Sequence, residues 1–294
     1  MSDPIVAAYK STPLKAQVER YSPVPLAPAP SVGRRLVLGF APPLILGILI
    51  VAAYALIRAD LPAHRQFLMP SAEGLWSQAF GIAAFRSELL MRALTTISIA
   101  ITGLAVSIPV GIMLGIVMFR VYALEKAVFP YLVALQSIPI MAIIPLIQSA
   151  LGFGFMPKVL IVALFTFFAI PTTLLLGLKS VDRNILELFK LQNASWWVML
   201  RKAALPSAAP TLFAGLRISG SLAVIAAIVS ELFFLSGKGG LGQLLMNAKI
   251  DFKYEQMYAA LIVASALSIT VYLTFNWLGN RLFAHWHESS DRQR

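Results

Sequence analysis

Long apolar runs without a charged residue dominate the chain after residue 35. Five of them hold at least 20 residues each, at 36–57, 93–119, 127–157, 159–178 and 256–280. A sixth apolar stretch, 211–234, is interrupted only by Arg217 and Glu231. Because a helix needs about 20 apolar residues to cross the ~30 Å hydrocarbon layer, the pattern predicts six membrane-spanning helices.

Proline and glycine punctuate the third of these runs, which is too long for one helix. The sequence LGFGFMP at 151–157 predicts a turn that ends the span near Ala150. Within the span, Pro139 and Pro145 each lack a backbone donor, which predicts kinks. Between the first two spans, residues 68–80 mix apolar and polar positions and predict a short helix lying on the membrane surface.

Composition supports a membrane protein and excludes several functional classes. The chain is 59% hydrophobic and 13% charged, which is too apolar for a water-facing protein of 294 residues. Its net charge of +11 comes without an arginine stripe or interleaved aromatics, so nucleic acid is not an expected partner. Cysteine is absent, which excludes disulfides and thiolate chemistry, and with three histidines a metal site is not expected.

The distribution of lysine and arginine predicts the orientation. With both termini in the cytoplasm, the inner segments hold 15 basic residues and the outer segments hold 7. The predicted layout is a flexible, proline-rich cytoplasmic tail (1–35), a first span with its external loop (36–87), a core of five spans (88–281) and a cytoplasmic C-terminal tail (282–294). The expected fold is an all-α membrane protein with six transmembrane helices.

The longest polar segment on the predicted inner face, 180–210, has the pattern of two helices separated by a break. Asn193 stands where the first helix should end, since asparagine follows glycine as the usual left-handed residue after a helix. Ser195 can then cap the second helix through its hydroxyl. Pro206 and Pro210 predict that the second helix stops and that the chain restarts there as the next span.

In this segment the sequence resembles the permease subunits of ABC importers. Their cytoplasmic loop carries the motif E-A-A, three residues, G, nine residues, I, one residue, L-P. The chain keeps the glutamate and the leucine-proline pair at that spacing, and departs from the motif at Leu188, Phe189, Asn193 and Ala203. The resemblance implies that 180–206 holds a coupling helix that docks into an ATPase subunit. The residues implied at that contact are Glu187, Leu188, Phe189, Asn193, Ala194, Ser195, Leu205 and Pro206.

Further motifs resemble one branch of that family, the nitrate, sulfonate, taurine and thiamine-precursor permeases. They are Q-S-I-P at 136–139, G-L-R at 215–217, the acidic Glu231 and G-L-G at 240–242. The resemblance implies the type I importer fold and transport by alternating access in the bacterial inner membrane. The bulky Leu188–Phe189 pair predicts a larger apolar groove in the partner ATPase. The solute stays open among nitrate, a sulfonate, taurine, bicarbonate, a vitamin precursor and an aromatic acid.

The partners follow from the same resemblance. They are two copies of a cytoplasmic ABC ATPase, a second copy of this chain in a homodimer, an extracytoplasmic substrate-binding protein and the lipid bilayer. The chain has no G-x-x-x-x-G-K-[ST] motif, so ATP and Mg are expected on the ATPase subunit. No catalytic residue, cofactor or metal is expected in this chain.

Polar residues inside the spans are candidates for the translocation path or its gate. Gln136, Ser137 and Pro139 give the third span a polar, kinked edge, which fits either a gate or hydrogen bonding between helices. Arg217 could meet an anionic solute or serve structure. For Glu231 a structural role is favoured, with the side chain reaching the membrane interface.

Two other patterns concern packing and alternative functions. Gly103, Ser107, Gly111 and Gly115 recur at a spacing of four, which predicts a close-packing face used within the subunit. An ion-coupled secondary transporter or channel is the alternative function, but Glu231 is the one acidic residue in the predicted spans. A membrane enzyme would need clustered histidine or acidic residues, which the spans lack.

Overall fold

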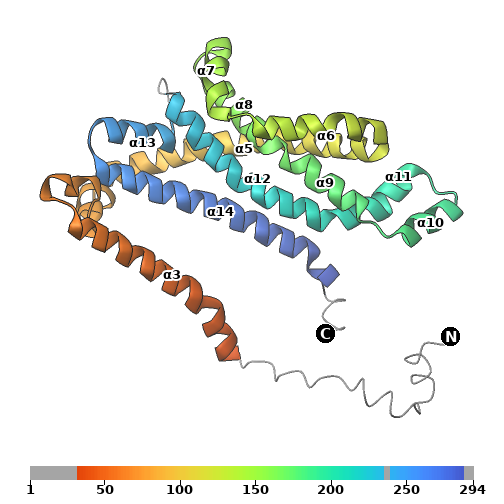
Figure 1. Ribbon diagram of the computed structural model, residues 1–294, viewed down its shortest axis with the longest axis horizontal. Coiled ribbons are helices and arrows are strands. Elements are labelled where there is room, and N and C mark those ends of the chain that lie inside the picture. Colours follow the sequence, from red (N-terminus) through yellow and green to blue (C-terminus); the bar gives the residue numbers. More distant parts are fainter. Residues whose placement is uncertain (1–31, 235–238, 288–294) are drawn as a thin grey trace, which may run out of the picture. The chain divides into compact units, whose positions relative to one another are not determined.

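The computed structural model describes residues 32–234 and 239–287, with side chains described over 41–234 and 239–282. All regular elements in these ranges are helical (Figure 1). The chain forms two compact units, Met1–Gln66 and Phe67–Arg294. The two predicted tails lie largely outside the described residues and stay predictions.

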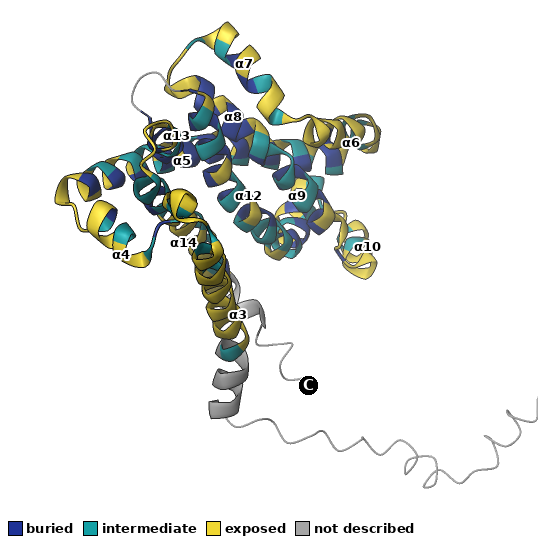
Figure 2. Cartoon of the chain, turned by 60° about the vertical axis from the view of Figure 1, so that its left-hand side comes forward, coloured by how far each residue is buried: buried dark blue, intermediate teal, exposed yellow. Residues whose placement is uncertain are grey.

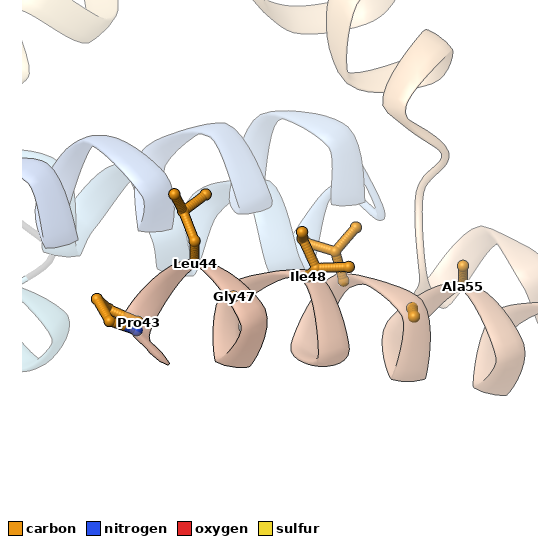
Figure 3. A pocket seen from close by; sticks show the side chains of 7 residues that line it. Pro43, Leu44, Gly47, Ile48 and Ala55 are labelled. Carbon is orange, nitrogen blue, oxygen red and sulfur yellow. The ribbon is translucent and has the colours of Figure 1, made fainter. Parts of the chain in front are cut away.

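In the first unit, the described residues form one long apolar helix, α3 (Val32–Asp60), followed by the start of η1 (Ala63–Leu68), whose last residues belong to the second unit. Most side chains of α3 from residue 41 to 60 are exposed, as the yellow part of the helix in Figure 2 shows. A shallow groove runs along the helix (Figure 3), lined by Pro43, Leu44, Gly47, Ile48, Val51, Ala52 and Ala55. All seven are apolar, so the groove suits lipid or another helix and offers no side-chain hydrogen bond to a polar solute.

The second unit alternates long apolar helices with short helices at their ends. Its elements are α4 (Ala72–Leu75), η2 (Trp76–Phe80), α5 (Ala83–Arg120), α6 (Tyr122–Ser137), α7 (Ile140–Leu151), α8 (Phe155–Phe167), α9 (Ala169–Lys179), α10 (Arg183–Leu191), α11 (Trp196–Met199), η3 (Leu200–Ala204), α12 (Leu205–Phe233), α13 (Leu241–Ile250) and α14 (Tyr254–His287). The helical α4 and η2 fall within the stretch 68–80, where a short helix is predicted.

Five helical stretches of the described residues are long and apolar enough to cross a membrane, and the bent pair α6–α7 makes a sixth if counted as one span. This confirms the predicted all-α fold. The third span is broken into two helices instead of being kinked as predicted, because α6 and α7 meet at an angle of 93°. Pro139 stands immediately before α7 and lacks the amide that would continue α6.

The predicted turn after the third span is confirmed. Gly152 follows the last residue of α7 with φ of 74°, a left-handed conformation that favours glycine. The next helix, α8, begins at Phe155, so Pro157 lies in its first turn and not in the loop. Proline is tolerated there because the first amides of a helix have no partner within the helix.

The core of the second unit forms where α12 packs against α5, α8, α9 and α14. On α5, Gly103, Gly111 and Gly115 leave no room for a β-carbon. The side chains that they face belong to α8 and α9, namely Val162, Ile170 and Leu174. Ser107 lies in the same row and donates to the carbonyl of Ala163 at 3.0 Å. The predicted close-packing face therefore works within the subunit.

Candidate functional site

The helix α10 is amphipathic and stands at the end of α12 opposite to α13 (Figure 1). Asp182 caps its N-terminus by accepting a hydrogen bond from the amide of Asn184 at 2.9 Å. Glu187 is exposed, and the apolar side chains of Leu188 and Leu191 are 53% and 81% exposed. The helix thus presents a mixed charged and apolar face away from the bundle.

The opposite face of α10 holds the helix to the bundle. Leu186 and Phe189 pack against a buried cluster that contains Leu178 and Leu200. The Leu188–Phe189 pair therefore splits, with Leu188 facing outward and Phe189 packed inward. Leu188 is the more exposed of the pair, and the expected contribution of both side chains to one groove of the ATPase stays a prediction.

The break between α10 and α11 has the predicted geometry. Asn193 adopts φ of 51°, and its amide donates to the carbonyl of Lys190 at 3.0 Å. The amide of Ala194 donates to the carbonyl of Phe189 at 3.0 Å, which closes the end of α10. Ser195 caps α11 through a hydrogen bond from the amide of Val198 at 3.4 Å. Residues 182–199, which lie within the segment 180–206 predicted to hold the coupling helix, are called the coupling element below.

The predicted proline stop after α11 is wrong. A single helical stretch runs from Trp196 to Phe233, through α11, η3 and α12. The turn η3 has the wider π geometry, and it ends at Ala204, two residues before Pro206. A widened turn relieves the clash between a proline ring and the preceding carbonyl, so the helix continues without a break. Leu205 and Pro206 consequently belong to the long helix, where both are half-buried.

Contacts at the surface join the coupling element and the adjacent end of α9 to α5 and α6. The guanidinium of Arg120, at the end of α5, lies 4.8 Å from the ring centroid of Trp196. Lys179, at the end of α9, pairs with Glu125 of α6 at 2.5 Å between Nζ and Oε1. A displacement of the coupling element would therefore act on the end of α5 through the contact between Arg120 and Trp196.

The polar residues of the third span lie at its break. Gln136, Ser137 and Pro139 are all exposed in the single chain. The hydroxyl of Ser137 donates to the carbonyl of Val133 at 3.2 Å, within its own helix. Their position at the junction of α6 and α7 suits either a path-lining surface or a contact with a second copy.

Arg217 joins two helices of the core. It is half-buried in α12, and its Nη1 donates to Oδ1 of Asn276 in α14 at 2.7 Å. The hydrogen bond supplies a structural role for this cation inside the apolar part of the chain. Asn276 was not predicted as a partner because it is one polar residue in a long apolar run.

The side chain of Glu231 is fully buried inside the protein, so it does not extend to the surface of the chain as expected. Its Oε2 accepts hydrogen bonds from Thr96 of α5 at 2.9 Å and from the amide of Gly242 at 2.8 Å. The hydroxyl of Thr96 also accepts from the amide of Leu241 at 2.8 Å. Nothing in the apolar sequence around Thr96 distinguished it, so this partner was missed.

A second buried charge, Lys158 of α8, lies near this group. The residue is 2% exposed, its Nζ lies 5.9 Å from the ring centroid of Phe234, and it interacts electrostatically with Glu231. The sequence signal was available, since Lys158 is the single charge that separates two apolar runs. Among the described residues, no group of three histidine or acidic side chains is placed to hold a metal.

Comparison with known families decides the class of protein. Residues 107–285 match the family described as "Binding-protein-dependent transport system inner membrane component". This chain belongs to that family. Its members are the permease subunits of ABC transport systems, multi-pass proteins of the inner membrane that are not enzymes themselves and work with a separate ATPase and a binding protein.

Curated permeases of this family extend the match over most of the chain. The riboflavin transport system permease protein of Chloroflexus aurantiacus is 32% identical over 229 residues, covering 78% of this chain and 84% of that protein. The formylaminopyrimidine transport permease protein of Halalkalibacterium halodurans is 36% identical over 187 residues, covering 64% and 74%. The resemblance drawn from the sequence motifs is confirmed.

Solved structures support the fold of a family permease. A chain of the MetNI methionine ABC transporter, in an inward-facing conformation, matches with a TM-score of 0.53 and 20% sequence identity. The match covers 74% of this chain and 99% of that one. The type I importer permease fold predicted from the sequence is therefore confirmed.

Proposed function

We propose that this permease forms half of the translocation path of an ATP-driven importer and moves a small solute by alternating access. A homodimer of the chain binds two ATPase subunits, one at each coupling element. The observation that carries the proposal is the exposed apolar face of α10 on a rigidly capped elbow.

The coupling element exposes apolar side chains that are more stable in a protein interface than in water. Leu188 and Leu191 stand exposed on a helix that also carries exposed Glu187 and Lys190. Trp197 of α11 adds a side chain that is 61% exposed. Aromatic and aliphatic anchors with a polar rim are typical of protein interfaces, and burying one such anchor contributes about 2 kcal/mol or more to binding.

The decisive test is reconstitution of the permease in liposomes with its ATPase and binding protein. Leu188→Asp should weaken ATPase binding at least tenfold and reduce ATP-driven uptake to the same extent, since a carboxylate would enter an apolar contact. Phe252→Asp is the matched control, because Phe252 is 71% exposed beyond the other end of α12. The control should leave the affinity for the ATPase unchanged, and equal ATPase affinity in both variants would contradict the docking role.

The orientation that we propose places both termini and the coupling element in the cytoplasm. Because the chain has no cysteine, single-cysteine variants report accessibility without background. Glu187→Cys should react with a membrane-impermeant thiol reagent only in inside-out vesicles, and Lys253→Cys only in right-side-out vesicles. The reverse pattern would overturn the orientation and remove the coupling element from the ATPase.

The path is proposed to run along the α6–α7 break, with Gln136, Ser137 and Pro139 on its wall. In the chain alone these residues are exposed, so a second copy can face them across a dimer axis. Gln136→Leu should reduce uptake without changing ATPase binding. For Arg217, wild-type uptake in Arg217→Gln would assign the residue to structure, consistent with its hydrogen bond to Asn276.

The solute class is proposed from the relatives. Two permeases that match at 32% and 36% identity are named for riboflavin and formylaminopyrimidine, which favours a vitamin or vitamin precursor with a heterocyclic ring. A thermal-shift screen of the cognate binding protein tests this directly. Stabilisation by flavins or pyrimidines supports the assignment, and stabilisation by nitrate, taurine or an alkylsulfonate instead would replace it.

The alternative, an ion-coupled secondary transporter, makes an opposite prediction in the same liposomes. Uptake driven by an ion gradient with no ATPase present would support the alternative. Uptake that requires both the ATPase and ATP supports the importer.

A further inference from the structure

The helix α13 is held by residues from other helices at its N-terminus. Its preceding residue, Gly240, supplies no side-chain cap. Instead the amide of Leu241 donates to Thr96 Oγ1, and the amide of Gly242 donates to Glu231 Oε2, each at 2.8 Å. We call Thr96 and Glu231, together with these two amides, the α13 anchor.

The backbone at Gly240 and Gly242 packs so closely against its neighbours that neither position has room for a side chain. A β-carbon at Gly240 would collide with the Glu231 carboxylate and the Thr96 hydroxyl, and one at Gly242 would collide with the carbonyl of Ile228. The backbone at Gly240 is not in the left-handed region, so space and not conformation requires the glycine.

Arginine at the start of α5 fixes the same turn from a second direction. Arg92 donates to the carbonyl of Gly239 at 2.9 Å and to Oε1 of Gln243 at 2.8 Å. Arg92 also pairs with Glu88 at 3.0 Å. The start of α13 is therefore bonded to α5 on both sides of Gly240 and to α12 through Glu231.

A buried carboxylate is a costly way to cap a helix. Replacing a buried charged group by apolar residues is often neutral or stabilising, so stability alone is weak ground for a buried charge. Ionisable groups inside a membrane protein are instead expected to serve function. Neither residue of the anchor has any exposed surface, and Glu231 is already bonded to the protein, so the anchor is not arranged to touch the solute.

The remainder of α13 leads to the surface. Asn247, Lys249 and Ile250 are exposed, and so are the residues 251–253 that follow. In the orientation proposed above, this is the side from which a binding protein arrives. If a bound protein displaced these exposed residues, the displacement would be transmitted to α5 and α12 through the hydrogen bonds of the anchor.

We propose that Glu231 and Thr96 are positioning residues that transmit docking of the solute-loaded binding protein from α13 to the helices of the path. The proposal rests on the proposed importer function. It assigns Glu231 to communication between the outer surface and the ATPase, and not to contact with the solute.

The test measures ATPase stimulation by the loaded binding protein in the reconstituted wild-type complex and in Thr96 variants. Thr96→Val removes the hydroxyl with little change in shape, and should lower the stimulation at least tenfold while basal ATP hydrolysis and ATPase binding stay at wild-type levels. Thr96→Ser keeps the hydroxyl and should restore stimulation. Thr102→Val is the matched control, because this threonine of α5 is half-buried and its hydroxyl donates to the carbonyl of Ser98 in its own helix.

Wild-type stimulation in Thr96→Val would overturn the proposal, whereas failure of the wild-type complex to couple ATP to uptake would overturn the proposed function instead. Hydrogen exchange of the wild-type complex gives a second measurement that no folding defect can affect. Docking of the loaded binding protein should change exchange in 241–250 and in α5 around Thr96. Unchanged exchange in both segments would likewise overturn the proposal.

Discussion

The polar contacts near the two ends of α12 differ in kind. Near the α10 end, Glu125 of α6 and Lys179 of α9 form an ion pair whose side chains are 18% and 46% exposed. At the α13 end, Thr96 and Glu231 are fully buried. An exposed ion pair contributes about 0–1 kcal/mol, so the first contact separates at little cost. Leaving a buried polar group without its hydrogen bond costs about 1–3 kcal/mol, and more where the group is charged.

The difference matches the task of each end in the proposed importer. The coupling element must follow an ATPase that opens and closes, and its own attachments include contacts that water can replace. The α13 anchor must instead transmit a small displacement of α13 to α5 and α12, which requires contacts that do not rearrange. Four substitutions test this contrast, ordered here from the largest expected effect to the smallest.

Gly240→Val should have the largest effect because it breaks the α13 end outright. The added side chain overlaps Glu231 and Thr96, and the expected destabilisation is more than about 3 kcal/mol once the anchor opens. Thermal unfolding of the purified complex measures it. Gly154→Val is the control, since a β-carbon at Gly154 meets no atom within 4 Å. Equal unfolding temperatures for the two variants would show that the anchor is not tightly packed.

Glu231→Gln should be the next most damaging, at about 1.5–3 kcal/mol, because it weakens charge-assisted hydrogen bonds without changing the shape. Glu88→Gln changes the same charge at a side chain that is 43% exposed and should cost less than about 1 kcal/mol. Chemical or thermal unfolding of both variants gives the comparison. A larger loss in Glu88→Gln would reverse the contrast between buried and exposed charges.

Asn193→Val tests the rigidity of the coupling element. The left-handed φ of 51° costs a β-branched residue about 1–2 kcal/mol, whereas Asn193→Gly relieves the backbone and should be neutral or slightly stabilising. Limited proteolysis between α10 and α11 should be faster in the valine variant, with a weaker affinity for the ATPase. Identical cleavage rates in the two variants would mean that the elbow does not depend on this turn.

Lys179→Gln should have the smallest effect, at most about 1 kcal/mol, because the ion pair with Glu125 is partly exposed. Its cost should also shrink between 0.1 M and 1 M salt, where the Debye length falls from about 10 Å to about 3 Å. Unfolding temperatures at the two salt concentrations measure this. A large, salt-independent loss would place the pair in the same class as the α13 anchor.

The sequence predicts those parts of the coupling element that depend on local chemistry. The left-handed Asn193 and the Ser195 cap each involve residues within a few positions, so the sequence pattern contains the whole interaction. The spans follow from hydropathy for the same reason. The missing backbone donor of Pro139 predicts a kink there, and the structure has a full break. The docking role of these residues is a prediction that the structure alone does not test.

The parts that the sequence misses depend on distant residues. Thr96 bonds Glu231 across 135 positions, and no pattern in either segment identifies the partner. The continuous helix through Pro206 was missed for another reason. A π turn before the proline makes room for its ring, and this turn forms where Leu200 and Ala204 pack in the core. Hydropathy identifies which segments enter the membrane and says little about how their ends are joined.

The uninterrupted helix from Trp196 to Phe233 has a mechanical consequence. Its 38 residues extend ~57 Å, nearly twice the thickness of the hydrocarbon layer. A stiff rod of that length behaves as a lever, so a tilt of a few degrees at the elbow swings the far tip by several ångströms. One piece of secondary structure can thereby carry motion through the whole membrane, and the π turn near its base is where such a lever would flex.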